Sequence, residues 1–453
     1  MNKKPAMKET TGNTTGQVKE PAMESITEPT PHPRLGPGGM RPVTVVGVGD
    51  DGCAGLSSRA VNAVAQAQVL AGGERHLAFF PQFQGKKVVL GAGLSHTVEL
   101  LAGEAQENNV CVLASGDPLF FGVGGLLAKK IGREHISFLP QPSSVQWAFA
   151  RLGLPWEDAG FLSVHGKPLA GVAVRLRSLA KAACLTDGIN TPPAIAAHLL
   201  AYGQSDWQAW VGENLGGADE RMRGFSLEEL AGAEDISPLN LLILARREGW
   251  QPPPVTGFLD EAEFARKTPK TGLITKREVR MISLARMAVT PESVVWDIGA
   301  GSGSVAVEAA WMADRGRVTA VEMDPQGADH CRANALAHGA DNLTVVEGRA
   351  PEALAGLEPP DAVFIGGTRG GMEPVLVAAH TALKPGGRLV VNAVTLENVG
   401  EAYQGFKKLG LDPDVTLMQI SRGIPLKGQT THYTRYEALN PIHIFSAVKP
   451  QNG

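Results

Sequence analysis

The sequence predicts an α/β protein with two successive regions of parallel, helix-covered sheet. Apolar runs of strand length alternate with segments of helical apolar spacing, first from Val43 and again beyond residue 258. This alternation is expected of parallel strands, because each is joined to the next by a crossover helix. In the later region the apolar run Val294–Trp296 leads into a glycine turn and an Ala-rich helix, as at the centre of a doubly wound, Rossmann-like sheet. A length of 453 residues allows about three domains of roughly 150 residues each.

Changes of composition divide the chain. The first 41 residues are rich in Thr, Pro, Glu, Lys and Gly with almost no large apolar side chains, so we expect a disordered tail. Three consecutive prolines, Pro252–Pro254, fit neither a helix interior nor a central strand and predict a semi-rigid linker. The expected order is a tail at 1–41, a first domain at 42–247 with subdomains at about 42–155 and 156–247, a linker at 248–257 and a second domain at 258–450.

The expected elements differ between these regions. The first subdomain has four strand–turn–helix units, with strands beginning at Val43, Lys86, Val110 and Ile136. The second subdomain has shorter strands, beginning at Phe161, Lys181, Trp207 and Leu239, and one helix at Pro192–Gly203. In the second domain Thr275 and Glu278 have the spacing of a capping box, which predicts a helix starting after Thr275. Extra strands at Val415–Gly423 and His443–Lys449 close the pattern.

Bulk composition restricts the function. A net charge of −4 argues against a dedicated nucleic-acid binder, which would show a basic footprint. The four cysteines are scattered without a CxxC pair, so we expect neither a metal cluster nor a disulfide framework, and buried small hydrophobes instead. There is no apolar run of 18 residues and no apolar signal-peptide core near the N-terminus, so we expect a cytoplasmic protein without membrane contact.

The glycine turn of the second domain carries the clearest chemistry. Asp297 ends the strand, and Gly299, Gly301 and Gly303 follow at alternate positions. A dinucleotide fingerprint reads G-x-G-x-x-G, whereas here the spacing is G-x-G-x-G, and an acid two residues ahead suits a ligand with a positively charged amino group. Glu322 lies roughly 20 residues on at the expected end of the next strand, where a carboxylate can hold ribose hydroxyls.

This pattern resembles the cofactor site of class I S-adenosylmethionine-dependent methyltransferases, against the alternative of a glycine turn in another α/β enzyme. The segments GLITKREVR, WDIGAGSGSVAVEAA, GRAPEAL, DAVFIGGTRGG and LKPGGRLVVNAVTLEN together resemble the precorrin C15 methyltransferase and C12-acetate decarboxylase family. The resemblance implies cofactor contacts from Thr275, Asp297, Gly299, Ala300, Gly301, Ser302, Gly303, Glu322 and Ala350. For Thr275 the helix-cap role stands as an equal alternative.

The first domain resembles a second family. The loop Ala114–Gly122, GVGDDGCAGLS, the Pro142–Ser144 turn, SVHGKP and WVGENLGGADERMRGFSLEEL occur in the order of the tetrapyrrole methylases, specifically their cobalamin-pathway C5 branch. That family binds S-adenosylmethionine between two α/β subdomains, and the implied cofactor contacts are Ser115, Gly116, Asp117, Leu119, Ser143, Ser144 and Gly212. Asp117 has a helix-capping alternative. The first loop departs from the common Gly-Pro-Gly by reading Asp50-Asp51-Gly52.

Together the two resemblances imply an S-adenosylmethionine-dependent, bifunctional cobalamin-biosynthesis enzyme. It would methylate C5 and C15 of precorrin-6B and decarboxylate the C12 acetate, giving precorrin-8. The loop Ile365–Gly371 is rich in glycine and lacks the Asn-Pro-Pro pattern of methyltransferases that act on nitrogen. Arg369 is the candidate for the acetate carboxylate, because arginine pairs well with carboxylates, and a solvated loop arginine is the alternative. His165 is the candidate for proton handling or substrate contact, with a structural role equally open.

Two other functions stay open at this point. One is an RNA or protein methyltransferase with a non-catalytic tetrapyrrole-binding front half, against which the acidic balance and the missing Asn-Pro-Pro loop weigh. The other is a front half that binds and delivers tetrapyrrole while catalysis is confined to the back half. We expect a small-molecule tetrapyrrole partner, no nucleic acid and a homo-oligomer. Whether the substrate carries cobalt is not readable from the sequence.

Overall fold

The computed structural model describes residues 41–91, 94–253, 258–267, 274–426 and 433–451. The predicted tail therefore lies outside the described residues, apart from Arg41. The chain divides into two compact units. Among the described residues, one unit contains 41–46, Ser58–Ala114 and Val123–Leu139. The other contains Gly47–Ser57, Ser115–Gly122 and the described residues from Pro140 onward.

The first unit is built on a five-stranded sheet in the order β3-β2-β4-β1-β5. Its strands are β1 (Val43–Val48), β2 (Val69–Gly72), β3 (Lys86–Val89), β4 (Val110–Ser115) and β5 (Ile136–Leu139). Its helices are α1 (Ser58–Ala65), α2 (Glu74–Ala78), α3 (Leu94–Glu104) and α4 (Gly124–Ile131). Strand β1 pairs parallel with β5, and β2 pairs parallel with β3 and β4. The four predicted strands are confirmed, and β2 was missed because four buried residues show no alternation.

The second unit begins with another five-stranded sheet, in the order β6-β7-β10-β8-β9. Its strands are β6 (Gly160–Ser163), β7 (Lys181–Leu185), β8 (Trp207–Glu213), β9 (Arg221–Ser226) and β10 (Asn240–Arg246). Strands β6 and β7 are parallel, and the other pairings are antiparallel. The predicted helix is confirmed as α7 (Pro192–Ala201), but α6 (Val172–Leu176), α8 (Leu227–Ala231) and β9 were not predicted. Two of these are five-residue helices, too short for a readable period.

Helix α5 (Ser144–Leu152) packs against this second sheet. Val145 and Phe149 are fully buried in one cluster with Ala183 of β7 and Ile243 of β10. The helix begins with a capping box, in which Ser143 Oγ accepts the N–H of Gln146 and Gln146 Oε1 accepts the N–H of Ser143. The residues just before the helix are therefore fixed in position by local hydrogen bonds.

The third sheet has seven strands in the order β13-β12-β11-β14-β15-β19-β16. Its strands are β11 (Val294–Ile298), β12 (Arg317–Glu322), β13 (Leu343–Glu347), β14 (Ala362–Ile365), β15 (Arg388–Ala393), β16 (Asp414–Met418) and β19 (Ile442–Val448). Strands β11 to β15 pair in parallel, and β19 is antiparallel to both β15 and β16. The predicted doubly wound sheet with extra C-terminal strands is confirmed. The strand order reverses between β11 and β14, which is where such sheets bind ligands.

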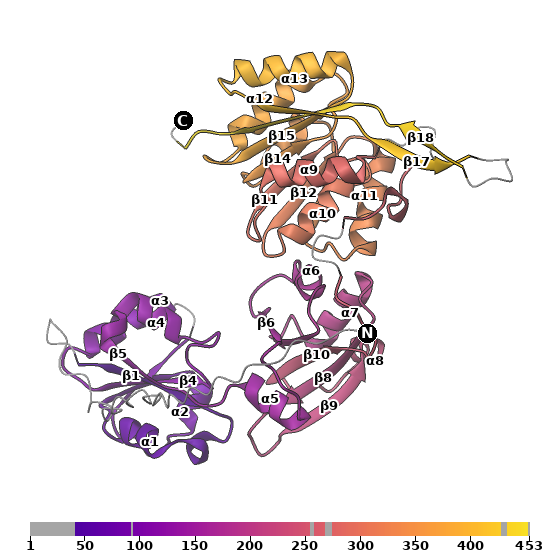
Figure 1. Cartoon of the computed structure of the whole chain (residues 1–453). Coiled ribbons are helices and arrows are strands. Elements are labelled where there is room, and N and C mark those ends of the chain that lie inside the picture. Colours follow the sequence, from indigo (N-terminus) through magenta and orange to yellow (C-terminus); the bar gives the residue numbers. More distant parts are fainter. Residues whose placement is uncertain (1–40, 92–93, 254–257, 268–273, 427–432, 452–453) are drawn as a thin grey trace, which may run out of the picture. The chain divides into compact units, whose positions relative to one another are not determined.

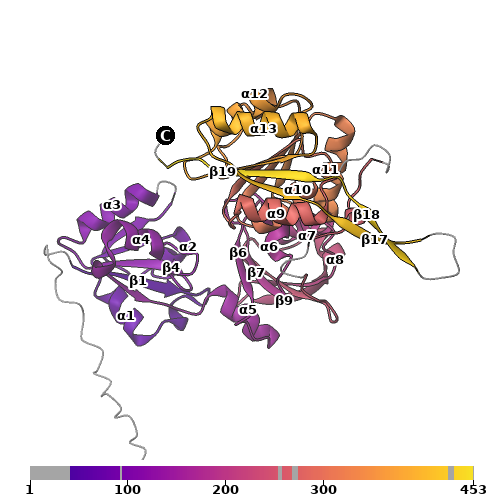
Figure 2. The same cartoon turned by 45° about the horizontal axis from the view of Figure 1, so that its top comes forward.

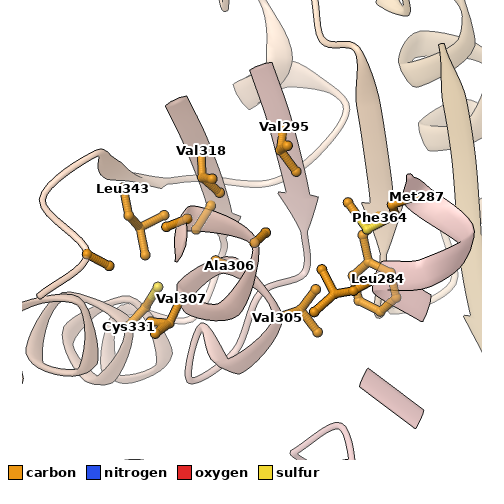
Figure 3. Close-up of a cluster of buried hydrophobic side chains, with 14 of the residues drawn as sticks. Leu284, Met287, Val295, Val305, Ala306, Val307, Val318, Cys331, Leu343 and Phe364 are labelled. Atoms are coloured by element: carbon orange, nitrogen blue, oxygen red, sulfur yellow. The ribbon is translucent and has the colours of Figure 1, made fainter. Parts of the chain in front are cut away.

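Helices cover both faces of this sheet, as Figure 1 shows. The helices are α9 (Arg277–Met287), α10 (Ser304–Met312), α11 (Pro325–Ala337), α12 (Met372–Ala382) and α13 (Leu396–Lys408). Val295 and Val305 belong to the cluster on the α9–α11 face (Figure 3). Trp296 and Ile298 belong to the cluster with α12 and α13. Alternate residues of β11 thus face opposite layers, as the period of a strand requires.

A two-stranded arm extends from this domain (Figure 2). It consists of β17 (Ser421–Pro425) and β18 (Thr434–Ala438), which are antiparallel. The single strand predicted at Val415–Gly423 is wrong, because its residues divide between β16 in the large sheet and β17 in the arm. Arg422 joins the arm to the domain, donating to Glu261 at 2.8 and 2.9 Å and to Glu278 at 2.6 Å.

Within the second unit, Asp341 connects the β6–β10 region to the domain that carries α11. Its carboxylate accepts the N–H groups of Ala173 and Val174 at 2.8 and 2.9 Å, and it lies 2.8 Å from Nε2 of His198. The side chain of Asp341 is fully buried. The buried carboxylate of Asp341 is therefore satisfied by partners that are remote in sequence.

The cysteine prediction is partly wrong. Cys111, Cys184 and Cys331 are buried as expected, and burial raises the pKa of each thiol to about 12. Cys53 is exposed, because it lies in the loop after β1. In the described part of the chain, every helix is too short or too polar to cross a membrane.

Candidate active site

A cavity of about 710 Å³ opens at the carboxyl ends of the parallel strands of the third sheet. Its walls come from the segments that follow β11, β12, β13, β14 and β15, together with the residues before α9 and at the base of the arm. Of the predicted cofactor residues in this domain, Thr275, Gly299, Ala300, Gly301, Ser302, Glu322 and Ala350 line the cavity. The strand order thus brings together residues from seven separate segments at the switch point.

Two glycines of the turn are required by close packing. Gly299 has φ +71°, and a Cβ placed on it would lie 2.2 Å from the carbonyl oxygen of Gly367. Gly303 has φ +75°, and its Cβ would lie 2.2 Å from Sγ of Cys331 on α11. The turn therefore fits closely between the β14 loop and α11, where a larger residue would displace it. Gly303 is a packing residue that does not line the cavity.

Glu322 holds the glycine turn from the neighbouring strand. Its Oε2 accepts the N–H of Gly301 at 2.7 Å, and its Oε1 accepts the N–H of Asp324 at 2.8 Å. The side chain lies at the end of β12, as predicted, and is almost wholly buried while lining the cavity. Each oxygen keeps a further lone pair, so the carboxylate can also accept hydroxyl protons from a ligand.

Asp297 lies beneath the turn. It is 1% exposed, it does not line the cavity, and neither carboxylate oxygen has a hydrogen-bond partner among the described residues. Burial raises its pKa to about 7, and the charge of Glu322 adds to that effect. The N–H of Ala306 acts in the opposite direction without reaching hydrogen-bond geometry. Asp297 is thus a buried carboxyl outside the cavity, and the predicted contact with the cofactor's amino group stays a prediction.

The predicted cap role of Thr275 is wrong. Helix α9 begins at Arg277 and its N-cap, Lys276, makes no side-chain cap bond. The N–H of Arg277 donates instead to Oε1 of Glu261 at 2.8 Å. The carbonyl of Thr275 instead accepts from Arg280 at 2.7 Å, which leaves Thr275 in the cavity wall. Arg280 is fully buried and also pairs with Glu308 through two bonds of 2.8 Å. This buried pair holds the segment before α9 against α10.

Cationic side chains gather along the cavity wall. They are Arg266, Lys267, Lys276, Arg349 and Arg369, and His330 lies in the same wall. Arg369 lies in the loop after β14 with a left-handed φ of +47°, and its side chain is exposed. Lys267 lies 2.6 Å from Asp324 and, with a smaller effect from Arg369, lowers the pKa of that carboxyl. Such a wall favours a ligand that carries several carboxylates.

Two uncharged polar residues at this site were not predicted. Thr368, beside Arg369, lines the cavity, and its Oγ1 is buried without a hydrogen-bond partner among the described residues. Asn392, near the end of β15, lines the cavity and is 7% exposed. The signal for Asn392 was present in the sequence, as a polar residue within the apolar run of β15.

Apart from Gly212 in β8, the front-half cofactor candidates lie at the segments 115–122 and 140–144, which contact each other and the segment after β1. The N–H of Gly116 donates to the carbonyl of Val48 at 3.0 Å, and its carbonyl accepts the N–H of Gln141 at 3.2 Å. A Cβ on Gly116, which has φ +54°, would lie 2.9 Å from Cα of Ser143. Ser115, Gly116, Asp117 and Leu119 therefore share one loop beside Ser143 and Ser144, all within one compact unit.

The polar groups of these loops have local partners. Asp117 does not cap the next helix, because α4 begins at Gly124 and the Asp117 carboxylate accepts the N–H of Leu119 at 2.9 Å. Leu119 is 56% exposed. Gly212 lies within β8, where a Cβ would approach Leu215 and Met222 to about 3 Å. His165 is exposed in the loop after β6, with Nδ1 3.3 Å from the carbonyl of Thr186.

Comparisons with known proteins agree with both halves. Residues 42–231 match the family described as tetrapyrrole (corrin/porphyrin) methylases, and residues 268–449 match the precorrin methyltransferase domain. The precorrin-6Y C(5,15)-methyltransferase [decarboxylating] of Sinorhizobium sp is 40% identical over 403 residues, which are 86% of this chain and 92% of that protein. The chain belongs to the precorrin-6Y C5,15-methyltransferase (decarboxylating) family.

Single-function relatives match each half separately. A cobalt-precorrin-7 C(5)-methyltransferase of Salmonella typhimurium is 37% identical over 40% of this chain and 88% of that protein. A probable cobalt-precorrin-6B C(15)-methyltransferase (decarboxylating) of Pyrobaculum calidifontis is 40% identical over 38% of this chain and 88% of that protein. This chain, as a member of the family, thus contains two methyltransferase domains, and its methyl donor is S-adenosylmethionine.

The second-domain residues fit S-adenosylmethionine. The glycine turn presents backbone to the cavity at the N-terminus of α10, and Glu322 offers spare acceptor capacity for ribose hydroxyls. Ala350, after β13, contributes an apolar wall suited to an aromatic base. These residues would hold the cofactor, and the cationic wall extends beyond them for a second ligand.

Proposed function

We propose that this chain transfers methyl groups to C5 and C15 of precorrin-6B and removes the carboxyl group of its C12 acetate, giving precorrin-8. One observation carries the proposal for the second domain. The cavity of about 710 Å³ combines a glycine turn for the cofactor with five lysine and arginine side chains suited to a polycarboxylate. For the first domain, support comes from the loops at 47–57, 115–122 and 140–144, which pack together in one unit.

The chain's contribution to C15 methylation is positioning. Bound S-adenosylmethionine supplies an electrophilic methyl group for direct displacement by carbon. The tight contact of Gly299 with Gly367 sets the cofactor turn directly against the β14 loop, where the acceptor would lie. Holding two reactants close and in line supplies several kcal/mol of the barrier. This direct displacement requires no covalent bond between the substrate and the described residues that line the cavity.

Decarboxylation needs a group that binds the acetate carboxylate and an acceptor for the electron pair of the C–C bond that breaks. We assign the carboxylate to Arg369, which lines the cavity on the loop after β14. As carbon dioxide leaves, the electron pair of the broken C–C bond passes into the conjugated macrocycle, and a proton from solvent completes the methyl group at C12. The exposed guanidinium of Arg369 orients the carboxylate beforehand.

In the first domain the cofactor assignments stay proposals. Gly116 and Ser143 lie at the meeting point of the three loops, which supports cofactor contact from their backbone. The hydroxyl of Ser143 caps α5 and its N–H donates to Gln146, so we assign Ser143 to the cofactor through van der Waals contact. His165 stays a candidate for substrate contact, because it is exposed beside Lys167. Cytoplasmic location and homo-oligomerisation stay predictions.

Mass spectrometry of the product tests the proposal. Purified full-length protein would be incubated with S-adenosylmethionine and metal-free precorrin-6B. We expect a gain of two methyl groups and loss of one carbon dioxide. One methylation with decarboxylation would contradict the assignment of the first domain. No reaction with this substrate or its cobalt complex would overturn the proposal and favour the alternative, an RNA or protein methyltransferase.

A further inference from the structure

Asn392 occupies an unusual place in the third sheet. Along β15, Leu389, Val391 and Ala393 belong to the cluster with α12 and α13, whereas Val390 belongs to the cluster beneath α9. The period of a strand places Asn392 on the same face as Val390, one step nearer the carboxyl end. Asn392 is 7% exposed, so its amide is buried in the sheet. Val390, its neighbour on the same face, is apolar.

The amide of Asn392 is locked by Ser283. Ser283 lies on α9, is fully buried, and its Oγ is 3.2 Å from Oδ1 and 3.0 Å from Nδ2 of Asn392. An asparagine amide has two N–H donors and two acceptor sites, and a single hydroxyl cannot engage them all. At least one N–H of Asn392, which lines the cavity, is therefore not engaged by Ser283. Two apolar residues in these places would leave the fold equally stable or more so.

Thr368 offers a second uncharged donor to the same cavity. Its Oγ1 is buried and has no hydrogen-bond partner in the described part of the chain. A buried hydroxyl without a partner destabilises the folded state. The pairing of β14 with β15 brings the two residues to neighbouring strand ends, because Ile365 pairs with Val391. The strand ends thus present two donors without charge.

We propose that the Thr368 hydroxyl and the Asn392 amide hydrogen-bond a peripheral carboxylate of the tetrapyrrole, other than the one held by Arg369. The inference rests on the proposed function. Uncharged donors add direction without the attraction of a full charge, so this pair fixes the rotation of the macrocycle in its plane. Apolar residues, among them Ile298, Val394 and Ile442, line the same cavity. Ser283 is a positioning residue that acts through Asn392.

The test uses full-length protein with methyl-¹³C-S-adenosylmethionine and precorrin-6B, and NMR assigns each methyl position. Thr368→Val removes the hydroxyl at nearly constant shape. We expect kcat/KM for C15 methylation to fall roughly five- to tenfold, with an unchanged or higher melting temperature and unchanged cofactor affinity. Asn392→Ala should cause a similar loss, and Ser283→Ala a smaller one. The melting temperature and the cofactor affinity of each variant, measured on the same samples, are the internal controls.

Asn392→Asp separates the chemical classes of partner. A carboxylate partner would be repelled, so this variant should lose more C15 activity than Asn392→Ala. Activity equal to or above that of Asn392→Ala would overturn the carboxylate assignment. Unchanged C15 kinetics in both Thr368→Val and Asn392→Ala would overturn the inference as a whole. A wild-type protein that places no methyl group on C15 would instead overturn the proposed function.

Discussion

The carboxylate of Glu322 and the backbone N–H of Gly301 are joined by a hydrogen bond of 2.7 Å. The residues are 21 positions apart, on the ends of adjacent parallel strands. The bond makes one side chain responsible both for the shape of the glycine turn and for the acceptor surface beside it. Cofactor binding in the second domain should therefore depend on this carboxylate more than on others nearby.

Glu322→Ala should remove one of two cofactor sites. We expect calorimetry on the full chain to give two S-adenosylmethionine molecules bound by the wild type, and one by the variant under the same conditions. The physical reason is loss of a charge-assisted bond to the turn together with loss of the ribose acceptor. Glu347→Ala is the matched control, because Glu347 pairs in register with Glu322 but is exposed. Two sites in Glu322→Ala would contradict this role.

The buried pair of Arg280 and Glu308 should be costly to break. Burial raises the pKa of Glu308, and the guanidinium opposes that shift. Glu308→Gln leaves the guanidinium without its counter-charge and should destabilise the second domain by about 3–5 kcal/mol. Urea unfolding measures the loss. The exposed pair of Arg315 and Glu292 is the control, and Glu292→Gln should cost less than about 1 kcal/mol.

Asp297 should make stability depend on pH. Its pKa rises from 3.8 when unfolded to about 7 when folded, so the folded state holds the proton more tightly between those values. Stability therefore falls as pH rises from about 4 to 7, and the full penalty is present above 7. Asp297→Asn cannot ionise. The unfolding free energy of the variant relative to wild type should increase by a few kcal/mol across this window.

Urea titrations at pH 4.5, 6 and 8 would measure that difference. Asp324→Asn is the control, because the pKa of Asp324 is lowered, chiefly by its hydrogen bond to Lys267. A constant difference between Asp297→Asn and wild type over the three values would mean that Asp297 is charged throughout.

Arg369→Gln should affect decarboxylation more than cofactor binding. Loss of the charge removes the group assigned to the acetate carboxylate, and we expect the decarboxylation rate to fall about 10- to 100-fold. Release of ¹⁴CO₂ from substrate labelled in the acetate measures this directly. Arg317→Gln is a suitable control, because Arg317 is exposed at the opposite end of β12. Equal decarboxylation rates in Arg369→Gln and Arg317→Gln would show that Arg369 has no role in decarboxylation.

Gly116→Ala should abolish C5 methylation while C15 methylation continues. The residue has φ +54°, and the added Cβ would meet Cα of Ser143 at 2.9 Å, so the loop must move. Gly103→Ala in α3 is the matched control, since nothing lies within 4 Å of its Cβ and alanine favours a helix. Methyl positions assigned by NMR would separate the two reactions. Normal C5 methylation in Gly116→Ala would exclude this loop from the first site.

The sequence by itself determined the features that depend on neighbouring residues. The turn at Gly299–Gly303 and the position of Glu322 at a strand end follow from glycine conformation and apolar runs, which are local properties. The alternation of strands and helices likewise predicted the doubly wound sheet. Short elements such as β2, α6 and α8 carried too few residues to show a period.

The tertiary structure decided what depends on partners remote in sequence. The spacing of Thr275 and Glu278 predicted a helix cap. In the structure Arg280 donates a hydrogen bond to the carbonyl of Thr275, and Thr275 lines the cavity. The partnerless hydroxyl of Thr368 and the locking of Asn392 by Ser283, 109 residues away, appear once α9 packs across β15. Desolvation, counter-charges and unsatisfied donors are properties of the packed interior, so a pattern of residue types along the chain does not contain them.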